Sequence, residues 1–354
     1  MMNKIILFVH TTAGLLSGLF ILLMSLSGAA LVFHEEVDEL QAPAVAHFSN
    51  TAYSIDKSYA ALQQHYPNAQ VSHCELPYHN NRAVTFTIYD SSYKTGTAGR
   101  QVFLDPLNGN ILKMRGGSDD LRNNFMSWLS AFHNSFHLGK TGEWLLGFFS
   151  LIFLLSIITG FILFRENVPA VLLFRRSVYK INNLHQVIGV WALVFNGMMA
   201  ITGFWMQRYV FKKEFYQSYN YTPVLKATPP LSYTFDSAYA AVKKAYPDFT
   251  AAVIYFAQSN SGKTAVYGSR ASNAYIHSRK FADAVFLDST GTIVQTRFFQ
   301  ENPADDRYDI INSQLHMGRF GGWGIKMIYF VFGLTGAMLS ITGFLLWWRR
   351  RKQK

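Results

Sequence analysis

Several of the eleven histidines in this chain stand within or beside apolar sequence, where an ionisable side chain is costly and points to function. In the stretch "SAFHNSFHLGKTGEW", His133 and His137 are separated by one helical turn and can share one face of a helix. A neutral imidazole is a common ligand of transition metals. Histidines on facing helices can therefore hold a metal ion, or the iron of a haem from both of its sides.

A second candidate pair, His10 and His185, comes from two apolar segments that align without a gap. In this alignment each histidine is followed one helical turn later by a glycine, Gly14 or Gly189. With a rise of about 1.5 Å per residue, His10 lies about 9 Å along a helix from Lys4, close to the inner membrane interface. This arrangement suits axial ligation of a b-type haem, the glycines leaving room for the macrocycle. The alternative is that each histidine only forms hydrogen bonds at the interface.

The outer candidates are His34, His133, His137 and His316, and two alignments compete for the partner of His316. Local similarity, "HLGKTGEW" against "HMGRFGGW", matches it with His137. Alignment on the Thr-Gly pair of each following segment matches it with His133, which precedes Gly160 by the same distance as His316 precedes Gly343. If both helices are unbroken, equal rise places these two histidines at equal depth. His34 ends the first apolar segment and can reach the same zone.

Two other uses of these histidines are open. A helical zinc pair is possible, but the hydrolytic version carries Glu after the first histidine, and here Asn134 follows His133. A structural or regulatory metal, or purely structural histidines, therefore remain as alternatives. Four dipeptides, each a Ser or Thr followed by Gly, recur in the apolar segments, and close helix packing is their predicted role. They are Ser27-Gly28, Thr159-Gly160, Thr202-Gly203 and Thr342-Gly343.

The elements that must position these histidines are four apolar segments. Each reaches the roughly 20 residues that a helix needs to cross a bilayer. The segments are Ile5–Phe33, Trp144–Phe164, residues 184–206 and Trp323–Trp348. The first is too long for the apolar core of a signal peptide, which is roughly 7–15 residues. We therefore expect a membrane protein with four transmembrane helices.

The net charge is +11, and the basic residues lie mainly at the ends of the apolar segments. This distribution does not indicate a nucleic-acid surface. Cations gather between the second and third segments, as at Arg165 and Arg175, and in "RRRK" at 349–352. Because short basic loops stay in the cytoplasm, both termini are predicted to be cytoplasmic and the two long connections to face outward. The lone Cys74 falls in the first connection, which rules out an intrachain disulfide, and we expect a buried thiol.

The two outward connections repeat one another. "YSIDKSYAALQQHYPNA" and "YTFDSAYAAVKKAYPDF" align without a gap, Asp56 with Asp236, and predict a helix that ends before Tyr-Pro. Alternating strands follow, and hairpins turn at Asn108-Gly109 and at Thr290-Gly291. Each connection is predicted to be a small α+β module with one helix on a short antiparallel sheet. The unit of helix, module and helix thus occurs twice, as two halves related by a pseudo-two-fold.

Over nearly its whole length, the chain resembles the PepSY-associated transmembrane family of iron-regulated membrane proteins. The resemblance rests on "SLSGAALVFHEEVD", "FHNSFHLG", "NLHQVIGVW" and "LHMGRFGG". It implies four spanning helices in a bundle, two periplasmic PepSY-like modules and two b-type haems. By resemblance His10, His185, His133 and His316 are the axial ligands. His34 and His137 match more variable positions, as alternative ligands or as ligands of a third haem.

The resemblance further implies a ferric-siderophore reductase of the bacterial inner membrane. Electrons from a quinol or a cytosolic reductase would cross to an outer haem and reduce a ferric siderophore or another Fe(III) chelate in the periplasm. This role places the protein in a lipid bilayer. It involves no nucleic acid, and it needs no residue for acid–base catalysis. The alternative is a non-enzymatic sensor or transport accessory whose PepSY modules bind peptide or chelate.

The predicted boundaries follow from these segments. The four transmembrane helices are residues 1–34, 131–165, 184–207 and 313–354, the last with its basic tail. The two modules are residues 35–130 and 208–312, and the cytoplasmic loop is residues 166–183.

Overall fold

The computed structural model describes residues 2–45, 54–77, 81–90, 99–175, 180–213, 232–256, 263–271, 276 and 278–353. Residues 176–179 of the predicted cytoplasmic loop and 214–231 of the second predicted module lie outside this set. The chain divides into two compact units. The helical unit comprises Met1–His34, Leu129–Tyr221 and Asn312–Lys354, and the sheet unit comprises Glu35–Trp128 and Thr222–Ile311.

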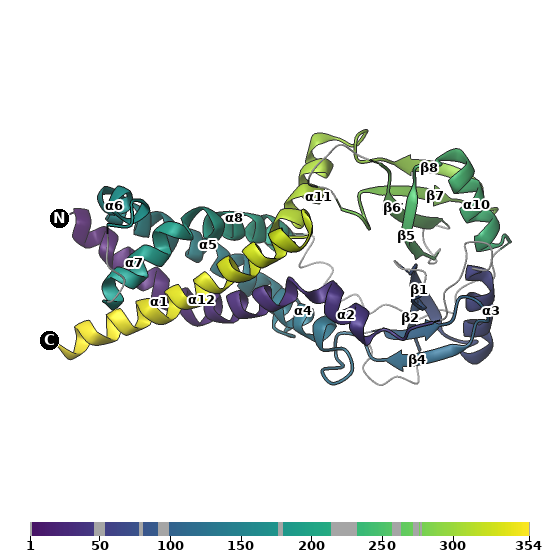
Figure 1. Ribbon diagram of the computed structural model, residues 1–354, viewed down its shortest axis with the longest axis horizontal. Helices are drawn as coiled ribbons and strands as arrows, with labels where there is room; N and C mark the ends of the chain where they lie inside the picture. Colours follow the sequence, from purple (N-terminus) through teal and green to yellow (C-terminus); the bar gives the residue numbers. More distant parts are fainter. Residues whose placement is uncertain are drawn as a thin grey trace. The chain divides into compact units, whose positions relative to one another are not determined.

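Long apolar helices make up the helical unit (Figure 1). Three of the described helical spans are long and apolar enough to cross a membrane, and a fourth qualifies if the bent pair α7–α8 counts as one span. The membrane-type helices are α1 (Met2–Leu31), α5 (Gly139–Phe164), α7 (Ile181–Trp191), α8 (Leu193–Gln207) and α12 (Gly322–Lys352). The shorter helices, some of them shared with the sheet unit, are α2 (His34–Gln41), α4 (Phe125–Ser135), η1 (Arg165–Asn167), α6 (Val168–Leu172), η2 (Arg208–Phe211) and α11 (Ala304–Met317).

Three of the predicted helices are interrupted, which corrects the expectation of unbroken spans. The third segment bends by 63° between α7 and α8, just after Gly189 in the last turn of α7. The predicted helix 131–165 breaks between α4 and α5, where Phe136 and His137 adopt positive φ. The predicted helix 313–354 breaks between α11 and α12, in a loop whose glycines also have positive φ. Positive φ cannot continue a right-handed helix, so the chain changes direction after α4 and after α11.

The sheet unit contains one antiparallel sheet in the order β4-β3-β2-β1-β5-β6-β7-β8, as far as the chain is described. The strands are β1 (Gln70–Glu75), β2 (Val84–Tyr89), β3 (Arg100–Leu104), β4 (Ile111–Arg115), β5 (Thr250–Tyr255), β6 (Thr264–Ser269), β7 (Asp283–Leu287) and β8 (Ile293–Arg297). The two predicted modules are therefore not separate sheets. They join through β1 and β5, where Cys74 pairs with Ile254.

Two helices, α3 (Ile55–His65) and α10 (Phe235–Ala245), lie on the same side of this sheet (Figure 1). As predicted, each ends directly before its Tyr-Pro pair. Both helices pack into one hydrophobic core with the inward residues of the strands, such as Leu62, Phe86 and Val242. Burying a side chain of this size contributes about 1.5–3 kcal/mol. Cys74 is fully buried in the same core, as expected for a small apolar residue.

The predicted hairpin turns are present at Gly109 and Gly291, whose φ values are 78° and 82°. An aspartate before each turn caps it: Asp105 accepts from the N–H of Leu107, and Asp288 accepts from the N–H of Thr290. The turn residues in the sequence thus predicted correctly where the two hairpins turn.

The N-termini of α3 and α10 cap one another. The Asp56 carboxylate accepts the N–H groups of Phe235 and Asp236, both at 2.8 Å. The Asp236 carboxylate in turn accepts the N–H of Ile55 at 2.8 Å and the hydroxyl of Ser54 at 2.5 Å. Orphan N–H groups at a helix start are commonly capped by a side chain at that start, as Ser54 and Thr234 do here, and in addition each half caps N–H groups of the other.

Burial raises the pKa of Asp56, and the nearby Asp236 adds to the effect. The folded chain therefore binds this proton more tightly than the unfolded chain. The resulting stabilisation is fully present below the ordinary value of 3.8 and is lost as the pH rises through the raised pKa. The hydrogen bonds that the two carboxylates accept from the N-termini of α3 and α10 offset the repulsion between them.

Replacing Asp56 with alanine should loosen the start of α10 more than any other part of the sheet unit. The amides of Phe235 and Asp236 would lose their acceptor, at a cost of about 1–2 kcal/mol for a lost cap. We expect local hydrogen–deuterium exchange over residues 234–237 to accelerate about tenfold, equivalent to ~1.4 kcal/mol. Asp119→Ala, at an exposed carboxylate, is the matched control. Unchanged exchange at α10 in Asp56→Ala would show that the reciprocal caps do not stabilise it.

Candidate metal centres

Four of the predicted histidines come together as two pairs of facing rings. His10 of α1 and His185 of α7 form the inner pair, with ring centroids 6.4 Å apart and planes at 70°. His133 of α4 and His316 of α11 form the outer pair, with centroids 6.3 Å apart and planes at 50°. All four side chains are half-buried. Each pair joins a histidine from the first half of the chain to one from the second half.

His137 takes no part in the outer pair. It lies in the turn between α4 and α5 with φ of 57°, is exposed, and has its ring 6.4 Å from that of Phe132. The alignment on the Thr-Gly pairs, which placed His133 level with His316, agrees with this geometry, and the local alignment of His137 with His316 does not. The agreement holds although the assumption of unbroken helices is wrong, because both breaks come directly after the paired histidines. His34 is half-buried at the start of α2 and belongs to neither pair.

Each paired histidine has its Nδ1 hydrogen-bonded to the hydroxyl of one of the four Ser/Thr-Gly dipeptides. The distances are 3.3 Å for His10 with Thr159, 2.8 Å for His185 with Thr342, 2.8 Å for His133 with Ser27 and 2.9 Å for His316 with Thr202. Each hydroxyl also donates, at 2.7 Å, to the carbonyl one turn before it in its own helix. The hydroxyl proton therefore bonds to this carbonyl and is not available to the histidine ring.

This double use of the hydroxyl fixes the tautomer of the ring. An oxygen that donates its proton to a carbonyl can only accept from the imidazole, so Nδ1 carries the hydrogen and Nε2 has a free lone pair. For His10 the carbonyl of Ser156, 3.0 Å from Nδ1, leads to the same result because it can only accept. Histidines that ligate metals are oriented by such a partner on the other ring nitrogen.

The glycine of each dipeptide makes room for the histidine ring. A Cβ placed on Gly160 would lie 2.9 Å from Cε1 of His10, and on Gly28 it would lie 3.1 Å from Cε1 of His133. The corresponding distances are 3.1 Å for Gly203 to His316 and 3.4 Å for Gly343 to His185. We call each dipeptide a histidine seat, with the hydroxyl for Nδ1 and the glycine for Cε1. The predicted role in helix packing is therefore incomplete, because each dipeptide also contacts a histidine ring.

The seats follow a reciprocal pattern. In the first half, His10 of α1 rests on the seat in α5, while His133, directly before α5, rests on the seat in α1. In the second half, His185 of α7 rests on α12, and His316, before α12, rests on α8. Each half thus orients its own two rings, and the two halves together complete both pairs.

The separation within each pair fits a metal ion between two imidazoles. Two metal–nitrogen bonds of about 2.0–2.1 Å, plus about 1 Å from each nitrogen to its ring centroid, total about 6 Å. Over the described residues, no group of three or more His, Cys, Asp or Glu side chains could hold a metal ion. Zinc in proteins commonly has three or four protein ligands. A metal with only two imidazoles from the chain suits haem, whose macrocycle supplies the remaining nitrogens.

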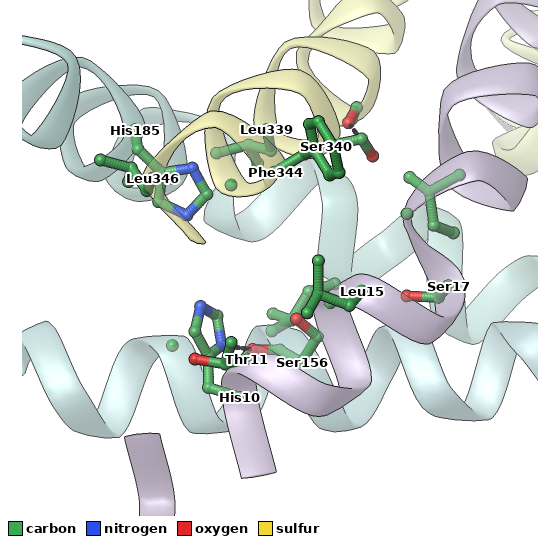
Figure 2. A pocket seen from close by; sticks show the side chains of 18 of the residues that line it. His10, Thr11, Leu15, Ser17, Ser156, His185, Leu339, Ser340, Phe344 and Leu346 are labelled. Atoms are coloured by element: carbon green, nitrogen blue, oxygen red, sulfur yellow. Dashed lines mark hydrogen bonds between the residues drawn. The ribbon is translucent and has the colours of Figure 1, made fainter. Parts of the chain in front are cut away.

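The inner pair faces a cavity of about 840 Å³ within the helical unit. Figure 2 shows His10 and His185 pointing toward one another across it from different helices. Aliphatic, aromatic and glycine residues line most of the cavity, including Gly14 and Gly189. A Cβ on either glycine would meet no atom closer than 3.7 Å, so this space is open as predicted. Sites for small molecules and cofactors are typically about 300–1,000 Å³.

A family model described as the PepSY-associated TM region matches residues 7–350, nearly the whole chain. No significant match was found among curated proteins.

Proposed function

Because this membrane protein belongs to the PepSY-associated TM family, we propose that it is a b-type di-haem cytochrome that reduces ferric iron across the bilayer. One observation carries the proposal: two pairs of facing histidines, each ring with Nδ1 bonded to its seat and Nε2 free. His10 and His185 would hold the inner haem iron, and His133 and His316 the outer. When bound, haem supplies one-electron chemistry.

The spacing of the two pairs supports a transmembrane role. Helix α1 carries both His10 of the inner pair and Ser27, which seats His133 of the outer pair. At the rise of an α-helix these two positions are about 26 Å apart, close to the roughly 30 Å of a hydrocarbon core. Redox sites near both faces allow a protein to move electrons from one side to the other.

The proposed topology has four spanning helices, with α7 and α8 as one bent span, in a bundle of two halves related by a pseudo-two-fold. The basic residues Arg349–Lys352 at the end of α12 favour a cytoplasmic C-terminus. Lys4 at the start of α1 favours a cytoplasmic N-terminus. The sheet unit would then lie in the periplasm, and the protein in the bacterial inner membrane.

The proposed substrate is a ferric siderophore or another Fe(III) chelate, and the proposed donor is a quinol or a cytosolic reductase. One electron per iron converts Fe(III) to Fe(II), which oxygen ligands hold more weakly, so iron is released. The residues of the chain need only orient the two sites and hold them apart, because no proton transfer accompanies this step.

Absorption spectroscopy of the purified full-length protein tests the proposal. We expect a Soret band, split α/β bands on dithionite reduction and two haems per chain. Adding a ferric chelate to the reduced protein should restore the oxidised spectrum as Fe(II) appears. A folded chain without haem, produced with adequate haem supply, would refute the cytochrome and favour a PepSY sensor or binding protein. A haem protein that a range of ferric chelates cannot reoxidise would refute only the reductase.

Thr342→Val tests the histidine seats at nearly constant side-chain shape. The substitution removes the acceptor of the His185 Nδ1 hydrogen, so the ring loses its orientation. Loss of such a partner typically weakens binding about 10–100-fold. We expect half of the haem to transfer faster to excess apomyoglobin. Ser150→Ala is the control, because that hydroxyl donates to the Gly147 carbonyl in α5 and is not among the residues that line the cavity. Equal transfer rates in the two variants would contradict a role for the seat.

A further inference from the structure

Arg350 of α12 is the only Asp, Glu, Lys or Arg among the described residues that line the cavity. The remaining lining groups are apolar, or are neutral polar side chains such as Thr11, Ser17 and Gln186. A single cation at the edge of an apolar cavity selects a particular kind of ligand. Such a ligand has a large apolar body and an anionic group at one end.

The helix geometry relates Arg350 to the inner histidine pair. Arg350 follows Gly343, the glycine that contacts His185, on the same helix. The two positions are nearly two turns apart, so they share one face of α12 and are separated by about 10 Å along its axis. Arg350 therefore lies on the His185 side of the helix, toward its basic C-terminal end.

The two basic residues that follow Arg350 contact aromatic rings instead of the cavity. The guanidinium of Arg351 lies 4.9 Å from the ring centroid of Trp347, and the ammonium of Lys352 lies 5.4 Å from that of Trp348. These contacts are cation–π interactions at the end of the helix. Arg350 instead lines the cavity. The cluster of basic residues at the end of α12 is thus not uniform, and one member is placed to meet a ligand.

We propose that Arg350 binds the carboxylates of the inner tetrapyrrole and so fixes the macrocycle with its acidic edge toward the end of α12. This inference rests on the proposed function. A guanidinium can donate two parallel N–H bonds to a carboxylate, and these charge-assisted bonds are among the strongest available. The apolar remainder of the cavity then receives the hydrocarbon edge. Arg350 is a positioning residue: it fixes the orientation of the group whose iron the histidines bind.

The test compares Arg350→Gln with Arg351→Gln in the haem-loaded full-length protein. In Arg350→Gln we expect about half of the haem to transfer to apomyoglobin roughly tenfold faster. The midpoint potential of the same haem should fall, because an unneutralised carboxylate favours Fe(III). Arg350→Lys should recover most of both properties, since it retains the charge. Arg351→Gln should match the wild type. The outer haem, held by His133 and His316, reports in every variant that the protein is folded.

Haem release and potential in Arg350→Gln that match those in Arg351→Gln would overturn the inference while leaving the cytochrome intact. A wild-type protein without haem would instead refute the proposed function itself. If Arg350→Gln does not fold, the wild type made without haem can be offered iron protoporphyrin or its dimethyl ester. We expect roughly tenfold tighter binding of the free acid at the inner site, and equal binding of both would overturn the inference.

Discussion

His10→Ala and His185→Ala should each reduce the haem content from two per chain to one. Both variants remove one of the two imidazoles that face each other at 6.4 Å. The remaining ring keeps its seat but cannot hold the iron from both sides. Among the described residues, the inner pair has no third His, Cys, Asp or Glu grouped with it. The pyridine haemochrome assay, expressed per chain, measures this loss directly.

The outer haem should survive in both variants, because its ligands and their seats lie on different turns of the helices. Ser27 and Thr202, which orient His133 and His316, are untouched by either substitution. The residual spectrum should therefore be that of a low-spin haem with two imidazole ligands. His65→Ala, at an exposed histidine of the sheet unit, should keep both haems. Loss of both haems from a folded His10→Ala protein would contradict two independent sites.

The histidine pairs were predictable because the chain carries its elements twice. The gapless alignment of two apolar segments related His10 to His185, and equal distances from the Thr-Gly pairs related His133 to His316. Both predictions depend only on helical rise and a shared reference point. The membrane-type helices and the hairpin turns were predictable for a similar reason, since apolar length and turn residues act locally.

The features that the sequence analysis missed depend on contacts between distant segments. The alternation within β1 and β5 predicts two strands but not that their edges pair, which makes one sheet of two modules. The aspartates at the start of α3 and α10 resemble ordinary caps of their own helices, yet each bonds to the other helix. The 63° bend between α7 and α8 occurs without a proline, the usual sequence marker of a sharp kink.

The role of the four Ser/Thr-Gly dipeptides as histidine seats was not predicted. A Ser or Thr within an apolar helix normally bonds to its own backbone, and a following glycine normally indicates close packing. Both explanations hold here, and each is sufficient to account for the dipeptides. The further role was therefore missed: the same hydroxyl accepts a second hydrogen bond from a histidine ring. In a repeated chain, one Ser/Thr-Gly dipeptide for each paired histidine is a signal that can be sought from sequence.

The two histidines of "FHNSFHLG" should behave differently when each is replaced with alanine. His133→Ala removes a ring that is seated on Ser27 and faces His316, so one haem per chain should be lost. His137→Ala removes an exposed ring in the turn between α4 and α5, and both haems should remain. The haem-to-protein ratio of the two purified variants distinguishes these outcomes.

The comparison is well matched, because both substitutions remove the same side chain from neighbouring positions in the chain. Ser27→Ala provides an independent approach to the same site: it leaves both rings in place but removes the acceptor of the His133 Nδ1 hydrogen. We expect this variant to release the outer haem about 10–100-fold faster than the wild type. Haem loss in His137→Ala but not in His133→Ala would place the iron ligand in the turn and would refute the outer pair.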